Sequence, residues 1–375
     1  MPRKILIVPD KFKGTLTARS AAEAIARGWR RVRPGDTLVL LPLTDGGDGF
    51  GEVMGGLLDA KVQVAKILDA AHRPRTARWW WEPGTRTAVI ESANAIGLAL
   101  LPPKKFHPFE LDTFGLGRLI RAAAAKGADR CLIGLGGSAT NDGGFGLARA
   151  LGWKFFDRNG NPIVRWTELE RLDRIVAPRR RRWFKEIVAA VDVQNPLLGV
   201  RGATQVFGPQ KGLKRAELAV AEQQLQTLAR KFRRQFGRDF TRMAGAGAAG
   251  GLGFGLLSFS GARLKSGFDL FARHAQLDRR LRAADLVITG EGKIDVSTLM
   301  GKGVGQIARR CRETGIPCLA LAGDVEGGTM VKSVFARTGA LAELAGAAGA
   351  KARAGYWLER LAEELGRRGE LLVES

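Results

Sequence analysis

The segment GLGGSATNDGG, residues 134–144, constrains the fold of this chain more than any other feature. It follows a short apolar run at residues 131–133 and precedes a segment with helical spacing at residues 145–151. A strand, a glycine-rich turn and a helix in succession bring backbone N–H groups and a helix N-terminus together, which favours anion binding. A glycine-rich connection with an Asn or Asp helix cap is the structural alternative, and this segment alone does not decide between the two.

Strand, turn and helix recur near both ends of the chain. Strand-like and helical segments alternate over residues 5–8, 18–31, 37–41 and 50–58, and again over 286–289, 304–312 and 318–322. This alternation predicts a parallel sheet with helices on its faces. Between these regions, the strand-like runs 62–67, 76–81 and 87–91 have no helices between them, which indicates a mixed or antiparallel sheet.

We therefore predict an α/β protein with two α/β domains. A parallel-sheet domain is built from both chain ends, residues 1–65 and 285–375, and a mixed-sheet α/β domain, residues 66–284, is inserted between them. The 375 residues are enough for two domains with large cores.

Composition limits where the protein acts. No apolar run approaches the roughly 18 residues of a membrane span, so we expect no membrane association. The apolar core of the first strand, residues 5–8, is too short for a signal peptide. Cys131, Cys311 and Cys318 are odd in number and lack metal-ligand spacing, which favours a reducing compartment. We expect a cytoplasmic protein.

The net charge of +23 raises the alternative of a basic nucleic-acid-binding protein. Two dense basic stretches occupy residues 171–185 and 230–238. No motif of a known nucleic-acid-binding module is present, so we interpret these stretches as solvated faces and expect no nucleic-acid partner. A positive field also suits an anionic small-molecule substrate and a nucleotide phosphate.

Several polar turns carry candidate chemistry. PDKFKGTLTA contains Asp10 and Lys13, and TDGGDG contains Asp45 and Asp48. Each follows a strand, at the sheet edge where ligands collect in α/β proteins. Asp192 follows a further strand-like run, residues 189–193. These carboxylates suit Mg²⁺, substrate hydroxyls or general-base chemistry, and helix capping is the alternative for each of them.

Residues 285–305 form a second candidate phosphate-binding region. DLVITGEGKID is expected to end a strand in a turn at Gly290, Glu291 and Gly292, followed by Asp295 and by Lys302 in GKGVG. The chain has no P-loop spacing, and none of its three histidines lies in a glycine turn. We interpret the glycine-rich stretch at residues 245–255 as structural, because glycines allow close backbone packing.

Six motifs in register resemble the bacterial class I glycerate kinase family. They are PDKFKGTLTA, TDGGDG, GLGGSATNDGG, DVQNPLLG with GATQVFGPQKG, GAGAAGGLGFG, and DLVITGEGKID with GKGVG. The resemblance implies ATP- and Mg²⁺-dependent phosphorylation of D-glycerate, with 2-phosphoglycerate favoured over 3-phosphoglycerate. It also implies two α/β domains, one of them flavodoxin-like, with the active site in the cleft between them. It does not determine whether the chain forms a homo-oligomer.

The motifs lead to residue assignments. The predicted catalytic residues are Asp192, Asp45 and Lys13. The predicted substrate-binding residues are Gly136, Gly137, Ser138, Asn141, Asp142, Asp48 and Lys211. The predicted nucleotide-binding residues are Gly290, Glu291, Gly292 and Lys302, and the predicted metal ligands are Asp295 and Glu291.

The chain departs from the family pattern at a few positions. Lys11 replaces a serine in the first motif, and Gln194 replaces a carboxylate in the usual VDNP stretch. Lys11 adds a charge beside the expected site. This leaves open a kinase for a related hydroxy acid, such as tartronate or hydroxypyruvate.

Overall fold

The chain forms an α/β protein with two compact units, which confirms the predicted fold class. The computed structural model describes residues 2–299, 303–328, 331 and 333–367. The first unit comprises Met1–Asp45 and Phe268–Ser375, and the second unit comprises Gly46–Gly267. Both predicted domain boundaries, near residues 65 and 284, lie C-terminal to these divisions. The assignment of separate functional domains to them stays a prediction.

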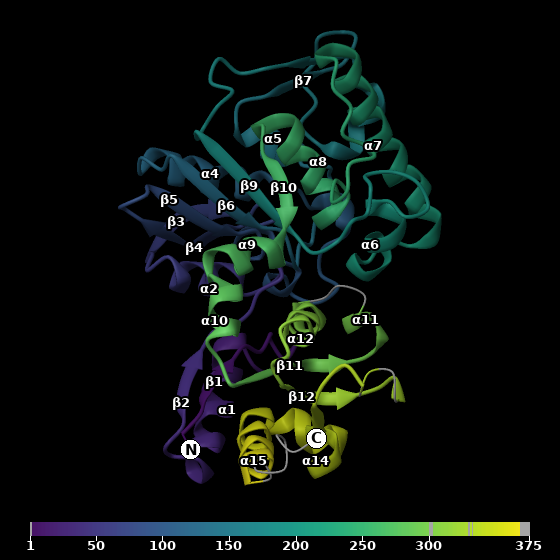
Figure 1. Cartoon of the computed structure of the whole chain (residues 1–375). Helices are drawn as coiled ribbons and strands as arrows, with labels where there is room; N and C mark the ends of the chain where they lie inside the picture. The colour runs from purple at the N-terminus through teal and green to yellow at the C-terminus, as the bar shows by residue number, and fades with distance from the viewer. Residues whose placement is uncertain (1, 300–302, 329–330, 332, 368–375) are drawn as a thin grey trace. The chain divides into compact units, whose positions relative to one another are not determined.

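The sheet of the first unit is parallel and combines both ends of the chain (Figure 1). Its strands are β1 (Lys4–Ile7), β2 (Thr37–Leu40), β11 (Leu286–Ile294), β12 (Cys318–Val325) and β13 (Arg337–Ala340). They lie in the order β13-β12-β11-β1-β2. Because β1 pairs with β2 on one side and with β11 on the other, the carboxyl ends of N-terminal and C-terminal strands meet at one sheet edge.

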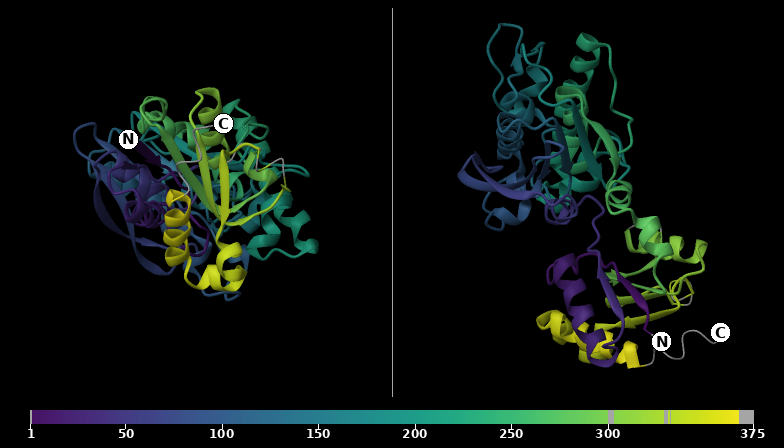
Figure 2. Two further views of the ribbon diagram at one scale, coloured as in Figure 1. Left: turned by 60° about the horizontal axis from the view of Figure 1, so that its bottom comes forward. Right: turned by 60° about the vertical axis from the view of Figure 1, so that its left-hand side comes forward.

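The helices of the first unit pack against this parallel sheet or against one another. They are α1 (Ala18–Val32), α9 (Gly267–His274), α10 (Leu277–Arg282), α11 (Val296–Leu299), α12 (Gly303–Glu313), α14 (Leu341–Ala352) and α15 (Ala354–Arg367). α1 and α15 pack side by side (Figure 1; Figure 2), so closely that a Cβ on Gly28 would lie 2.0 Å from Glu359 O. Ile5 and Ile288 share a buried core with these two helices, and α12 lies on the opposite face.

The second unit contains a six-stranded mixed sheet and a short antiparallel ribbon. The strands of the sheet are β3 (Lys61–Leu68), β4 (Pro74–Glu82), β5 (Thr87–Glu91), β6 (Arg130–Gly134), β9 (Glu186–Val191) and β10 (Arg263–Ser266). Their order is β10-β9-β6-β5-β4-β3, parallel from β10 to β5 and antiparallel thereafter. β7 (Lys154–Phe156) pairs with β8 (Arg174–Val176). The predicted mixed sheet is confirmed.

The helices of the second unit surround a large apolar core. They are α2 (Phe50–Leu57), α3 (Ala93–Ile96), α4 (Phe114–Ala125), α5 (Phe145–Ala150), α6 (Ala203–Lys211), α7 (Arg215–Phe236) and α8 (Ala248–Ser260), with 3-10 turns at Leu98–Leu100, Pro108–Glu110 and Trp166–Arg171. α2 was predicted beside the parallel sheet but packs on the mixed sheet. Cβ atoms on Gly51 and Gly55 would lie 2.0 and 2.4 Å from the Trp80 indole, so two glycines bring α2 onto β4.

Two strands differ from the sequence prediction. β11 was predicted to end at Thr289 but continues to Ile294, paired with β12 as far as Val325. Gly290 and Gly292 therefore lie within a strand and form no turn. Glycine is required there because a Cβ on Gly290 would lie 2.0 Å from Leu321 O. β9 begins at Glu186 and ends at Val191, so its C-terminal end lies just before Asp192.

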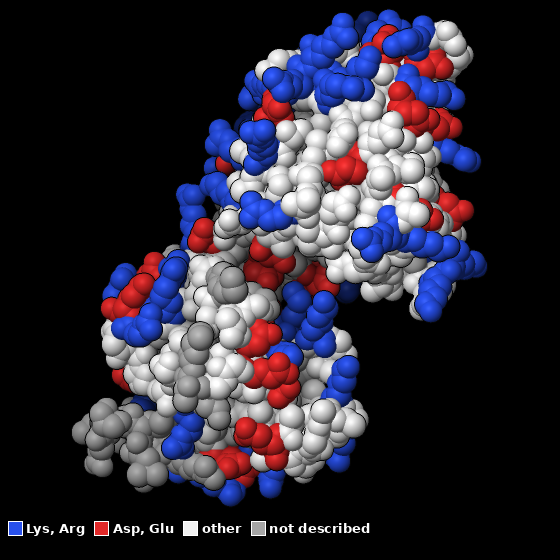
Figure 3. Space-filling model, turned by 90° about the vertical axis from the view of Figure 1, so that its right-hand side faces the viewer, with Lys and Arg blue, Asp and Glu red and all other residues white. Residues whose placement is uncertain are grey.

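Most of the net charge of +23 belongs to the second unit. Figure 3 shows Lys and Arg side chains spread over one face of the molecule. The arginines at positions 179–182 are exposed, as predicted, and the Arg180 guanidinium lies 4.6 Å from the Trp183 ring centroid. Within the described residues, no helix is both long and apolar enough to cross a membrane.

Candidate active site

Acidic side chains gather at the carboxyl end of the parallel sheet in the first unit. Asp10 follows β1, and its N–H donates to Gly290 O at 2.8 Å. Asp45 follows β2 and forms an ion pair with Lys11 at 3.9 Å. Glu291 lies within β11. The strand order therefore brings three carboxyl groups from distant parts of the sequence to one edge, and Lys11 lies among them.

Asp10 has a strongly raised pKa. Burial raises the pKa of its carboxyl to about 7, and the negative charges of Asp45 and Glu291 add to the rise. The Lys11 ammonium and the Lys11 N–H, which donates to Asp10 Oδ1 at 2.7 Å, oppose it in part. An acid with such a pKa is poised to change its charge near neutrality, which is a common property of functional sites.

Glu291 and Asp295 are held by the turn that follows β11. Thr298 Oγ1 donates to Glu291 Oε1 at 2.8 Å, and the Ser297 N–H donates to Asp295 Oδ1 at 2.8 Å. Among the described residues, no group of three or more His, Cys, Asp or Glu side chains is arranged to hold a metal ion. Any cation held by Glu291 or Asp295 would therefore take further ligands from water or from a bound phosphate, as Mg²⁺ commonly does.

Lys13 and Lys302 were predicted as site residues in the first unit, and the structure describes only Lys13. Lys13 is exposed. A Cβ on Gly292 would lie 3.1 Å from Lys13 N, so the backbone of Lys13 is close to β11. Lys302 lies outside the described residues. The predicted phosphate-binding turn at residues 290–292 is wrong as a turn, because the glycines belong to the ladder between β11 and β12. They bring the backbones so close that a Cβ on Gly323 would lie 2.4 Å from Gly292 O.

The opening glycine motif, residues 134–144, follows β6 in the second unit and contacts the TDGGDG loop. A Cβ on Gly136 would lie 2.6 Å from Gly47 Cα, and one on Gly137 would lie 2.3 Å from Asp48 Oδ1. Gly137 has φ +60°, a conformation that favours glycine. Asp48 is exposed and close to this turn. The structure therefore brings together three of the predicted substrate-binding residues.

Glu91 is a buried acid that the sequence analysis missed. It ends β5, and its two carboxylate oxygens accept hydrogen bonds from Gly49 N and Gly51 N, each at 3.0 Å. It therefore ties the TDGGDG loop and the first turn of α2 to the sheet. No local motif marks it, since it is the last residue of a strand-like run.

Asp142 lies at the centre of a buried network. Oδ2 accepts from Thr113 N at 2.9 Å, Thr113 Oγ1 at 2.7 Å and Gly146 N at 2.9 Å, and Oδ1 accepts from Gly144 N at 3.2 Å. Burial and the charge of Asp112 raise its pKa to about 6, although these hydrogen bonds lower it in part. Its oxygens fasten the starts of α4 and α5, as the helix-capping alternative predicts.

Lys211 is a buried cation that faces the same loop. Its Nζ donates to Ser138 Oγ at 3.1 Å and to Thr140 O at 2.6 Å, and the residue is only 8% exposed. Burial lowers its pKa to about 7, and the charge of Asp142 opposes this shift. Lys211 ends α6, so it meets residues that lie 73 and 71 positions earlier in the sequence. Lys211 and Ser138 were predicted as substrate-binding residues, but their contact and the part played by Thr140 were not.

Asn141 and Thr204 form a second link between the loop and α6. Asn141 Nδ2 donates to Thr204 Oγ1 at 3.0 Å, and both residues are fully buried. Within the described residues, Asn141 Oδ1 and the neighbouring Thr140 Oγ1 are buried and have no hydrogen-bond partner. Thr204 was not among the predicted site residues.

Asp192 directly follows β9, next to the glycine loops. Its side chain is exposed. Two residues earlier, Ala190 O accepts from Leu135 N at 3.0 Å, and a Cβ on Gly46 would lie 3.2 Å from Ala190. Asp192 thus follows the strand end at which both glycine loops meet.

The glycine-rich stretch at residues 245–255 has the structural role that was predicted. Ala249, Gly250 and Gly251 have left-handed backbone conformations. A Cβ on Gly250 would lie 1.9 Å from Thr140 O, and Gly250 O accepts from Gly143 N at 3.1 Å. This stretch supports the loop at residues 138–143 by backbone-to-backbone packing.

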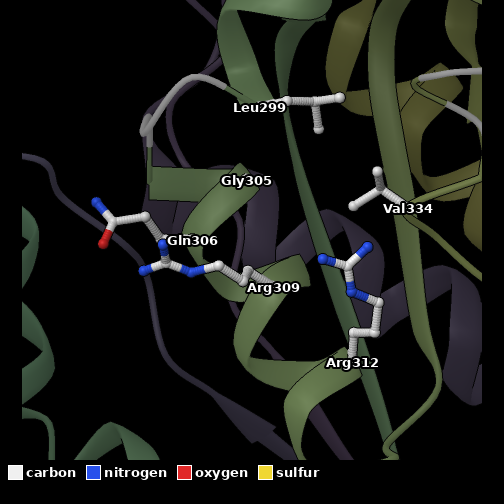
Figure 4. Close-up of a pocket in the computed structure, with 6 residues that line it drawn as sticks. All are labelled: Leu299, Gly305, Gln306, Arg309, Arg312 and Val334. Carbon is white, nitrogen blue, oxygen red and sulfur yellow. The ribbon is translucent and has the colours of Figure 1, made fainter.

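A separate pocket of about 120 Å³ lies at α11 and α12 of the first unit (Figure 4). It is lined by Leu299, Gly305, Gln306, Arg309, Arg312 and Val334. Arg309 also pairs with Glu313 at 3.8 Å. The pocket contains Gly305 of the GKGVG segment, and its two arginines give it a positive character.

The fold and these clusters define a class of protein: an α/β enzyme whose strand ends carry carboxylates, lysines and glycine-rich loops. This donor set suits phosphoryl transfer, where positioning and charge neutralisation supply most of the catalysis.

Comparison with known proteins gives the family. A model of the glycerate kinase family matches residues 5–369. Glycerate kinase from Bacillus subtilis is 40% identical over 86% of this chain and 85% of its own length, and glycerate 2-kinase from Escherichia coli is 38% identical with the same coverage. A crystal structure from Salmonella typhimurium, provisionally assigned as glycerate kinase 2, has a TM-score of 0.84, with 33% identity over 99% of each chain. This chain belongs to the glycerate kinase family.

Proposed function

We propose that this chain transfers the γ-phosphoryl group of ATP to D-glycerate with Mg²⁺, giving 2-phosphoglycerate in preference to 3-phosphoglycerate. Family membership supports the kinase activity, and the name of the Escherichia coli relative supports the 2-phosphate product. The observation that carries the proposal furthest is the buried contact of Lys211 with the loop at Ser138. A cation beside a glycine-rich turn suits a small carboxylate substrate.

The acceptor substrate is assigned to the loops of the second unit. Backbone N–H groups at Gly136 and Gly137, together with Lys211, would hold the carboxylate. Ser138, Asn141 and Asp48 would contact the hydroxyl groups. Asp142 is fully engaged by its own chain, so in this proposal it positions the loop and makes no direct contact with the substrate.

Asp192 is the proposed general base for the attacking hydroxyl. It is an exposed carboxylate beside the strand end where the two glycine loops meet, and a base must be accessible to its substrate. Asp45 and Lys13 of the first unit are the other proposed catalytic residues, and Asp45 is paired with Lys11.

The nucleotide and Mg²⁺ are assigned to the first unit. Burial raises the pKa of Asp10 most, the charges of Asp45 and Glu291 raise it further, and a positive charge bound nearby would reduce that repulsion. Glu291 and Asp295 would hold the ion together with phosphate oxygens and water. When bound, Mg²⁺ neutralises charge on the transferring phosphoryl group. Lys302 completes the proposed nucleotide site, whereas Gly290 and Gly292 are assigned to the close packing of β11 on β12.

An assay with ATP, Mg²⁺ and D-glycerate tests the proposal, with the product identified by phosphorus NMR. A 2-phosphoglycerate signal supports it in full. A 3-phosphoglycerate signal would retain the activity and contradict the regiochemistry. Tartronate and hydroxypyruvate belong in the same panel, because Lys11 replaces the family serine. We expect D-glycerate to be preferred, since the Lys11 charge is engaged by Asp45.

A further inference from the structure

Lys211 is not the only residue of α6 that contacts the loop at residues 138–141. Thr204, Gly208 and Lys211 are buried and spaced by four and three residues, so they share one face of the helix. Thr204 and Lys211 both hydrogen-bond to the loop at residues 138–141, two helical turns apart. The loop therefore lies along α6, and a change in α6 alters what the loop presents.

The side-chain amide of Asn141 has a hydrogen-bond partner for its nitrogen but none among the described residues for its oxygen. Its Nδ2 donates to Thr204 Oγ1, whereas its Oδ1 is buried and has no partner among the described residues. Leaving a buried acceptor unpaired is costly, so such an atom in a functional loop indicates a missing donor. The adjacent Thr140 Oγ1 is unpaired in the same way.

Glu222 on α7 explains why the amide has this orientation. Its Oε1 accepts from Gly199 N at 2.7 Å, and the nearby Thr204 hydroxyl lowers the pKa of this carboxyl group, which burial raises. A hydroxyl whose hydrogen faces the Glu222 carboxyl group presents its lone pairs to Asn141. It therefore attracts the NH₂ end of the amide and turns the carbonyl end away.

We propose that Thr204 is a positioning residue that fixes the Asn141 side chain with Oδ1 toward the substrate, so that this subsite accepts a hydrogen bond from a substrate hydroxyl. The inference rests on the proposed function and deepens it, because it makes the hydroxyl a requirement for binding at this loop. A site built to pair with a hydroxyl strongly rejects analogues that lack it.

The test compares Thr204→Val, which has the same shape but no hydroxyl, with Thr204→Ser, which keeps the hydroxyl. Steady-state kinetics give KM for D-glycerate and for ATP. Inhibition constants are measured for lactate and 3-hydroxypropionate, each of which lacks one hydroxyl of glycerate. Thr227→Val is the matched control, because Thr227 is a buried threonine on α7 outside the proposed site. Thermal unfolding of every variant reports on folding.

We expect Thr204→Val to raise KM for D-glycerate by between about 5-fold and 100-fold, the range for one lost hydrogen bond in a buried site, with little change in KM for ATP. Thr204→Ser should stay near wild type, and Thr227→Val should leave both KM values unchanged. The acid that lacks the hydroxyl bound by Asn141 should inhibit wild type and Thr204→Val equally, whereas the other acid should bind more weakly to the variant.

Three results would overturn the inference. They are an unchanged KM for D-glycerate in Thr204→Val, an equal weakening of glycerate and both analogues, and no rescue by Thr204→Ser. If Thr204→Val fails to fold, Thr204→Ala and Thr204→Ser are compared in the same way. Wild-type protein without glycerate turnover would contradict the proposed function and the inference together, whereas normal wild-type turnover with any of the three results contradicts the inference alone.

Discussion

At the scale of single residues, the proposed base is the most direct point to test. Asp192→Asn keeps the size of the side chain and removes its ability to accept a proton. We expect kcat to fall by at least about 100-fold, which is typical for the loss of a general base, with little change in thermal stability because the side chain is exposed. Turnover close to wild type would remove Asp192 from the mechanism and direct attention to Asp45.

Asp10 makes stability depend on pH. Its folded-state pKa of about 7 lies above the ordinary value of 3.8, so folding favours its protonated form. The stability that protonation contributes is fully present below the ordinary pKa and is lost as pH rises through about 7.

Asp10→Asn mimics the protonated acid, and its Oδ1 can still accept from Lys11 N. Urea unfolding near pH 8 should therefore show the variant to be more stable than wild type by on the order of 1–4 kcal/mol, and the difference should shrink toward about pH 5. Asp59→Asn, at an exposed position, is the control. A difference that is the same at both pH values would contradict this assignment.

At the scale of elements, glycines decide which backbones can meet. Gly144, at the start of α5, and Gly255, in α8, face one another, because a Cβ on Gly255 would lie 2.6 Å from Gly144 Cα. Gly56 near the end of α2 would direct its Cβ into open space. Both α8 and α2 contain several other glycines, so the two positions form a matched pair.

We expect Gly255→Ala to destabilise the protein by about 1–3 kcal/mol, because α5 and α8 must separate. Gly56→Ala should be neutral or stabilising by up to about 1 kcal/mol, because alanine is the better helix former. Chemical denaturation of both variants measures the difference. Equal effects at the two positions would show that helix propensity, and not close packing, governs Gly255.

At the scale of the whole molecule, the second unit is a continuous stretch of chain with its own core. Its sheet, its helices and its large apolar cluster all lie within Gly46–Gly267. We expect a fragment of residues 46–267 to fold alone and to unfold cooperatively on heating, because a core of this size supports an independent domain. A fragment of residues 1–45 should not fold, since β1 pairs with β11. Circular dichroism and thermal unfolding provide the test. A fragment of residues 46–267 that unfolds without a cooperative transition would contradict the expectation.

Much of the fold followed from local pattern. The helix expected at residues 18–31 is observed as Ala18–Val32, and the strand expected at residues 87–91 is observed as Thr87–Glu91. Both predictions are confirmed because the spacing of apolar residues reports on local structure. Gly290 was misread as part of a turn for the opposite reason. Nothing nearby in the sequence shows that Leu321 of the neighbouring strand lies against it and excludes a side chain.

The sequence by itself determined the fold class, the glycine-rich loops at strand ends, and the types of side chain available for chemistry. Only the tertiary structure decided which of them meet and which are already engaged. In the folded chain Lys211 hydrogen-bonds to Ser138, and both carboxylate oxygens of Asp142 accept hydrogen bonds. Glu91 and Thr204 hydrogen-bond to the loops of the site, which no local motif indicates. The reason is physical: propensity and periodicity act over a few residues, whereas burial, pKa shifts and hydrogen-bond partners depend on side chains that lie far apart in the sequence.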